Sequence, residues 1–136
     1  MDPRMIPDVH PNPRLNLMRD YVAETVRALA EGGLRVDRSW LDPEKPRDST
    51  ILYHGADEGM RALVWDEETG WRTGAYVHGE PGVRTELNDA AYLGGGVLAT
   101  PGDVAGRLHD GVREPRRAYR SMWDLRDGLD DALRTY

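Results

Sequence analysis

The sequence contains no cysteine and no phenylalanine, and Lys45 is its single lysine. Without cysteine, disulfide scaffolds, thiol nucleophiles and cysteine-ligated zinc or iron–sulfur sites are excluded. Because phenylalanine is absent, the core must be filled by leucine, valine, tyrosine and tryptophan. We expect this core to be thin. No apolar run approaches the roughly 18 residues that a membrane-spanning helix needs, so no membrane association is expected.

Positive charge is also scarce. The 24 acidic residues outnumber the 18 basic ones, and the net charge is -6. Nucleic-acid phosphates require a basic surface, so a nucleic-acid partner is disfavoured. The first 13 residues contain four prolines and lack the apolar centre of a signal peptide, which predicts a soluble cytoplasmic protein.

A chain of 136 residues is the usual size of one domain. Prolines in residues 1–11 lock φ and remove amide donors, which predicts a flexible arm. Residues 12–114 are expected to form an α+β domain. Residues 115–136 carry an apolar stripe at helical spacing and are predicted to form a C-terminal amphipathic helix.

Local signals predict the elements of the domain. An apolar stripe predicts a helix that begins at Pro13, is capped by Asn12 and ends at Gly32-Gly33. Strands are predicted near 34–40, 50–54 and 83–87, the last with 91–93 as a continuation or a separate strand, and Thr100-Pro101 opens a second helix. The order predicts an antiparallel sheet of about four strands, with an N-terminal helix and two C-terminal helices on one face and the other face free.

A β-hairpin from Met60 to His78, turning at Glu67 to Gly70, is the clearest local feature. Its register is left open by the sequence. A four-residue loop would place Leu63, Trp65, Arg72, Tyr76 and His78 on one face. A three-residue loop would instead place Trp65 with Trp71, Thr73, Ala75 and Val77.

The segments Ala62–Glu67, Gly70-Trp71, Ala91–Gly95 and Thr100-Pro101 together resemble an uncharacterised domain-of-unknown-function family of small single-domain actinobacterial proteins. The similarity spans roughly Leu17 to Val112. It implies an actinobacterial source and assigns no reaction and no catalytic residue.

Chemical signals are sparse. His54 with Asp57 and Glu58, and His78 with Glu80, lack the further ligands that a metal site needs, so no metal is expected. Gly94-Gly95-Gly96 precedes a helix, but Pro101 removes an amide and Asp103 repels an anion, so no nucleotide or other cofactor is expected. Glu67 and Glu68 are predicted to be solvated turn residues. No catalytic residue is assigned, and an enzyme is less favoured than a binding protein.

The leading hypothesis is a non-enzymatic interaction or accessory module that binds another protein, itself as a homodimer, or both. Aromatic and arginine side chains are typical of interface hot spots, although core packing is an equal explanation for the tryptophans of the hairpin. The candidate interface residues are Arg61, Trp65, Trp71, Arg72, Tyr76, Tyr119 and Trp123. The alternative is a small enzyme or small-molecule-binding protein with a pocket between helix and sheet that uses His54 or His78.

Overall fold

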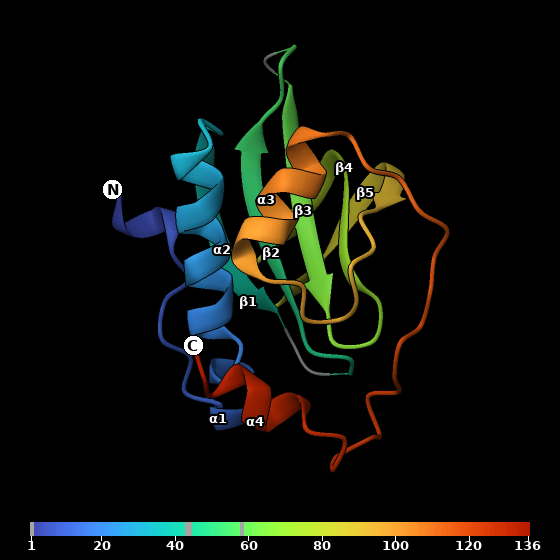
Figure 1. The fold of residues 1–136 in the computed structure, drawn as a ribbon. Coiled ribbons are helices and arrows are strands. Elements are labelled where there is room, and N and C mark those ends of the chain that lie inside the picture. The colour runs from blue at the N-terminus through green and yellow to red at the C-terminus, as the bar shows by residue number, and fades with distance from the viewer. Residues whose placement is uncertain (1, 43–44, 58) are drawn as a thin grey trace.

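The structure is a computed structural model that describes residues 2–42, 45–57 and 59–136. It has an α+β architecture in which helices lie against a five-stranded antiparallel sheet (Figure 1). The strands pair in chain order and are β1 (Val36–Asp42), β2 (Asp48–His54), β3 (Met60–Asp66), β4 (Gly70–Glu80) and β5 (Val83–Tyr92). The helical elements are η1 (Pro3–Met5), α1 (Pro13–Asn16), α2 (Arg19–Glu31), α3 (Pro101–His109) and α4 (Leu129–Leu133).

Helix α2 and the sheet enclose the main core, and α3 packs beside α2 (Figure 1). The apolar stripe predicted for this helix is buried, but the helix is interrupted at Leu17 and Met18, so that α1 and α2 are separate. Asn12 caps α1 as predicted, because its side chain accepts a hydrogen bond from the Arg14 amide. Thr100 caps α3 in the same way.

The hairpin is confirmed, and its loop has three residues. Trp65 pairs with Trp71 and Asp66 with Gly70, which leaves residues 67–69 as the loop. Trp65, Trp71 and Thr73 therefore share one face, and both tryptophans enter the main core. Gly70 has φ +74°, a conformation that glycine adopts without strain.

The opposite face of the sheet is not free as expected. Trp40, Leu52, Ala62 and Val64 form a second apolar cluster there, against which Tyr76 and Leu87 pack. Irregular register between β4 and β5 marks bulges that bend this outer hairpin. Thr85 of β5 consequently reaches Thr50 of β2, with 2.6 Å between the two hydroxyl oxygens.

The proline-rich segment packs against the domain instead of extending as a free arm. Met5 and Ile6 are half-buried against the main core, and Pro7 is buried. The Arg19 guanidinium donates to the Pro7 carbonyl at 2.9 Å. These contacts hold residues 5–7 beside α2 and β1.

The prediction of one helix over residues 115–136 is wrong. Only α4 is helical there, and the preceding segment runs irregularly along the side of the molecule (Figure 1). Its backbone donors find distant partners, because the Tyr119 amide donates to the Glu68 carbonyl and the Met122 amide to the Glu68 carboxylate. Tertiary hydrogen bonds therefore replace those of a helix. Within the described ranges, no helix is long and apolar enough to cross a membrane.

Candidate functional site

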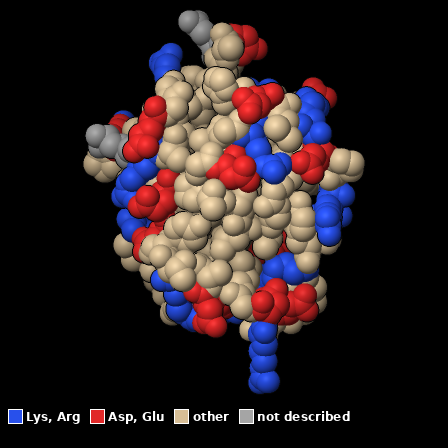
Figure 2. All heavy atoms as spheres, in the orientation of Figure 1, with Lys and Arg blue, Asp and Glu red and all other residues tan. Residues whose placement is uncertain are grey.

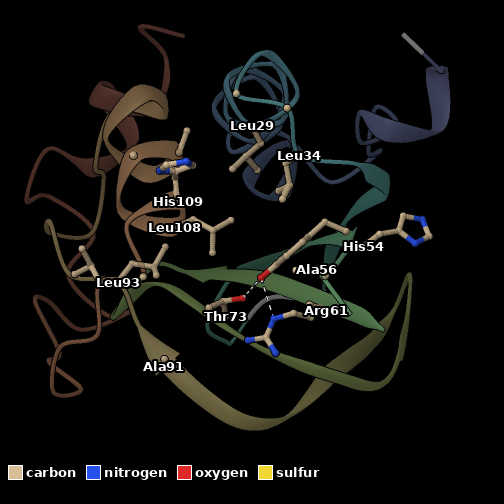
Figure 3. Close-up of a pocket in the computed structure, with 18 of the residues that line it drawn as sticks. Leu29, Leu34, His54, Ala56, Arg61, Thr73, Ala91, Leu93, Leu108 and His109 are labelled. Atoms are coloured by element: carbon tan, nitrogen blue, oxygen red, sulfur yellow. Dashed lines mark hydrogen bonds between the residues drawn. The ribbon is translucent and has the colours of Figure 1, made fainter. Parts of the chain in front are cut away.

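A cavity of about 850 Å³ lies between the C-terminal parts of α2 and α3 and the sheet (Figure 3). Leu29 approaches it from α2, Leu34 from the segment that follows α2, and Leu108 from α3. The other apolar positions that line it are Ala56, Ala91, Leu93, Ala105 and Val112. The walls are thus mainly aliphatic.

Small residues create this space. Gly32 and Gly33 end α2, and Ala105 with Gly106 form the adjacent turn of α3. A Cβ atom added at Gly106 would meet no heavy atom within 4 Å. Glycine inside a helix destabilises it by about 1 kcal/mol relative to alanine. Gly106 therefore lowers the stability of α3, and the need for a stable helix does not explain its presence.

The strand side of the cavity carries a chain of polar groups. The Thr73 hydroxyl donates to the Ala62 carbonyl at 2.9 Å, so it accepts from the Tyr53 hydroxyl, whose oxygen lies 2.6 Å away. The Tyr53 oxygen in turn accepts from the Nε of Arg61 at 3.3 Å. Figure 3 shows Thr73 and Arg61 on the strand side of the cavity, across from Leu29, Leu34 and Leu108. This series of hydrogen bonds fixes the Arg61 side chain through its Nε. The two terminal nitrogens of the guanidinium take no part in the series.

The charged groups around the cavity are mainly cationic. Arg61 and Arg113 line it, and Asp57 is the single carboxylate among the described lining residues. The Asp57 carboxylate accepts from the Gly59 amide at 3.0 Å. Glu58, which we grouped with His54 and Asp57, lies outside the described residues.

The histidines lie away from the polar chain. His54 is at the edge of the cavity with its ring directed outward, and its Nε2 is 3.6 Å from Asp37 (Figure 3). His109 lines the cavity from α3 and is 3.2 Å from Asp110. His78 does not line it, since its Nε2 lies 2.7 Å from Glu86 on the outer hairpin. Of the two histidines named in the alternative hypothesis, only His54 therefore borders the pocket.

The hairpin tryptophans of the predicted interface lie inside the core. Trp65 is 0% and Trp71 1% exposed. The Trp65 indole donates to the Val97 carbonyl at 2.7 Å, and the Trp71 indole donates to the Tyr21 hydroxyl at 3.0 Å. Without phenylalanine, these indoles supply the bulk that the core requires, so neither is available to a partner.

The remaining predicted interface residues are dispersed. Arg61 lines the cavity, whereas Arg72 pairs with Asp66 at 2.9 Å. The half-buried Tyr76 packs on the second apolar cluster. Tyr119 is half-buried, and Trp123 is 70% exposed on the C-terminal segment. The structure therefore does not bring these seven side chains together.

Glu67 is not the solvated turn residue that we predicted. Its side chain is 2% exposed and contacts Arg47 at 3.1 Å and Arg120 at 3.0 Å. Burial by itself would raise the pKa of Glu67, but the hydrogen bonds and charge of Arg47, together with the hydrogen bond from Arg120, hold the pKa below its usual value. Glu68 is half-buried and accepts from the Met122 amide.

Charged side chains of both signs are interspersed on the face that carries α2 and α3 (Figure 2). Within the described ranges, no group of three histidine or acidic side chains could hold a metal ion. The cavity, which is partly open to solvent, combines space for a ligand with oriented polar groups.

Reasoning from the sequence missed Tyr53 and Thr73 as site residues. Tyr53 pairs with Arg61 across β2 and β3, so the two side chains lie on the same face. The register of the hairpin, which places Thr73 on that face, is the signal that would have found them.

The comparisons with known proteins give one match. A family model described as a family of unknown function (DUF6292) matches residues 21–110. No curated protein and no solved structure matches the chain. The matched stretch contains the whole sheet, α2 from Tyr21 onward, α3 and the polar chain on the strand side of the cavity.

Proposed function

This chain belongs to the DUF6292 family of unknown function, and from its structure we propose that it binds a small molecule in the cavity between α2, α3 and the sheet. The single observation that carries the proposal is an aliphatic cavity of about 850 Å³ with an ordered polar group on one side. Ligand sites combine apolar walls with a few polar groups that orient the ligand, and their volumes run from roughly 300 to 1,000 Å³.

The proposal is for binding rather than catalysis. The groups fixed on the strand side are a tyrosine and a threonine, which donate and accept hydrogen bonds, and an arginine, which donates them. The bordering histidines each lie beside an aspartate at the edge of the cavity. This arrangement favours recognition of a ligand over proton transfer to it.

The test is a thermal-shift screen with small apolar alcohols, acids and phenols. A ligand present at about 100 times its Kd stabilises the folded state by roughly 2.7 kcal/mol, which raises the melting temperature by several degrees. Ala105→Leu, and separately Gly106→Leu, should remove the shift by filling the cavity. Ala118→Leu is the matched control, because Ala118 is exposed and does not line the cavity.

An equal shift in wild-type protein and in both filled variants would show binding elsewhere and would contradict the proposal. The absence of any shift across the screen would contradict it as well. The unfolding free energy of each variant, measured without ligand, separates lost binding from lost folding.

A second candidate function is protein contact through the C-terminal segment. Trp123 is 70% and Leu125 66% exposed, and exposed large apolar side chains close together are typical of interaction sites. We propose that this pair forms the contact surface of the interaction module predicted from the sequence, with a second copy of the chain as the first partner to test.

Sedimentation velocity across a range of concentrations tests this candidate. The variant Trp123→Ser/Leu125→Ser should lose self-association that the wild-type protein shows. Val9→Ser is the matched control, because Val9 is 69% exposed and lies at the other end of the chain. A wild-type protein that is monomeric at every concentration would refute the homodimer. A cytoplasmic location and an actinobacterial source stay predictions from the sequence.

A further inference from the structure

We infer that the ligand of the cavity is an amphipathic monocarboxylate, whose apolar body lies against the leucines of the helices and whose carboxylate binds Arg61. This inference rests on the proposed function and names the chemical class of its ligand. It is carried by one arginine that has a fixed position and forms no ion pair with the residues that the structure describes.

Arg61 is exceptional among the arginines of the described residues. The other buried or half-buried ones each lie within ion-pairing distance of a carboxylate; these are Arg14, Arg19, Arg47, Arg72, Arg107 and Arg120. Arg61 is half-buried and makes no ion pair with a described residue. Asp57 Oδ1 and the Arg61 side chain both lie beside Gly55, but the two groups are not within ion-pairing distance. A partly desolvated cation that no carboxylate contacts is unfavourable, so a site that retains one is arranged for an anion from outside.

The hydrogen-bond chain prepares Arg61 for this role. Its Nε donates to the Tyr53 hydroxyl, which donates to Thr73, which donates to the Ala62 carbonyl. Tyr53 and Thr73 are 4% and 7% exposed, so the support is buried and ordered. The terminal nitrogens of the guanidinium then present a planar pair of donors, which matches the two oxygens of a carboxylate.

The helices restrict the ligand to a single negative charge. The cavity borders the C-terminal ends of both α2 and α3, where the helix dipoles place partial negative charge. A phosphate or a dicarboxylate would carry further negative charge toward those ends, whereas one carboxylate on the strand side avoids them. Leu29, Leu34 and Leu108 occupy the helix side and favour an uncharged aliphatic body there (Figure 3).

The test is isothermal titration calorimetry with octanoate, 1-octanol and octyl phosphate, each below the concentration at which it forms micelles. A bidentate ion pair contributes roughly 1.5 to 3 kcal/mol, so octanoate should bind about 10 to 100 times more tightly than octanol. Octyl phosphate should bind more weakly than octanoate.

Arg61→Gln should reduce the preference for octanoate over octanol to within about threefold, because the alcohol does not use the ion pair. Arg61→Lys should keep part of the preference, since it retains the charge without the planar fork. Arg126→Gln is the matched control, because Arg126 is exposed and does not line the cavity. Circular dichroism shows whether each variant folds. If Arg61→Gln does not fold, the test uses the octanoate preference of Arg61→Lys in its place.

The two proposals fail in different ways. Equal binding of octanol and octanoate, tighter binding of octyl phosphate, or an unchanged preference in Arg61→Gln would overturn the monocarboxylate while the cavity still binds. Binding of none of the three compounds, or equal binding to Ala105→Leu, would overturn the binding function itself.

Discussion

Asp42 and Asp48 lie opposite each other at the paired ends of β1 and β2 and are 1% and 0% exposed. The Trp40 indole and the Thr50 hydroxyl donate to Asp42, and Arg84 donates to one oxygen of Asp48 at 2.7 Å. The other oxygen, Oδ1 of Asp48, is buried without a hydrogen-bond donor in the described part of the chain. A proton on Asp42 would supply that donor, so the geometry favours one proton shared by the pair.

This pair predicts that stability falls as the pH rises. Burial, with the charge of Asp48 next, raises the pKa of Asp42 to about 8, and burial raises the pKa of Asp48 to about 6. Both values exceed the unfolded value of about 3.9, so the folded state binds more protons than the unfolded state above pH 4. The free energy of unfolding should therefore decrease between about pH 4 and pH 8, by up to about 1.4 kcal/mol per pH unit for each proton, and level off above pH 8.

Urea unfolding at pH 5, 6.5 and 8 measures how steeply the free energy of unfolding falls with pH. Asp42→Asn keeps the size of the side chain and supplies a permanent donor, so it should flatten the slope and stabilise the protein at pH 8 relative to wild type. An undiminished slope in Asp42→Asn would show that other groups cause the pH dependence.

Glu67 determines how the C-terminal segment docks. Its carboxylate accepts from the backbone and the guanidinium of Arg47 and from Arg120, while Arg47 also contacts Asp130 at 2.7 Å. Three distant parts of the chain therefore share one buried charge network. Removal of one partner leaves uncompensated charge in the interior.

Glu67→Gln should lower the free energy of unfolding by about 3 to 5 kcal/mol, because Arg47 and Arg120 lose the buried anion that they share and keep only the partly exposed Asp130 and Asp127. It should also speed trypsin cleavage at Arg116 and Arg117. Glu68→Gln is the control, since an amide oxygen can still accept from the Met122 amide, and it should change little. A Glu67→Gln protein as stable as Glu68→Gln would show that the network does not hold the segment.

At the scale of elements, the hairpin loop is fixed by both its local sequence and its neighbours. The Asp66 carboxylate accepts from the amides of Glu68 and Thr69, which closes the three-residue loop. Gly70 then approaches the next loop so closely that an added Cβ would lie 2.7 Å from the Gly96 carbonyl oxygen. Position 70 requires glycine for its positive φ and for this close approach.

Alanine substitutions separate these two effects. Gly82 has φ +88° and open space around an added Cβ, so Gly82→Ala should cost about 1 to 2 kcal/mol for the left-handed conformation alone. Gly70→Ala should cost a further 1 to 3 kcal/mol, roughly, because the new methyl group displaces the 94–97 loop. Equal losses in urea unfolding would mean that the loop adjusts freely.

At the scale of the whole molecule, the family match is shorter than the folded unit. Residues 21–110 omit Leu15, Met18, Leu129 and Leu133, all of them buried in the main core. They also omit Tyr136, whose ring lies 5.0 Å from that of Tyr21. Both ends of the chain therefore complete the core that the sheet begins.

A fragment of residues 21–110 should lack a cooperative unfolding transition, because it exposes the core under α2 and loses Arg120, one of the two arginine partners of Glu67. Residues 12–136 should fold with reduced stability, since they lose the contacts of Met5 to Pro7 and the hydrogen bonds of His10 with Asn12 and Asn16. Circular dichroism during thermal unfolding compares both fragments with the full chain. A 21–110 fragment with the midpoint of the full chain would show that the terminal segments are accessory to the core.

The sequence by itself determined the elements whose signals are local. Asn12-Pro13 and Thr100-Pro101 opened helices where predicted, and the strands on either side of Gly70 formed the hairpin. Helical periodicity and capping depend on residues within a few positions, so these features can be read from the chain alone. The fold class followed from their order.

Only the tertiary structure decided the features that depend on distant residues. Trp65 and Trp71 pack in the core, and Glu67 pairs with Arg47 and Arg120. Residues 115–128 are irregular because backbone donors of this segment bind the hairpin loop. The cavity likewise exists because α2, α3 and the strands β2 to β5 meet around small side chains. Burial, pairing and enclosed space arise from packing between segments far apart in sequence, and no local pattern encodes them.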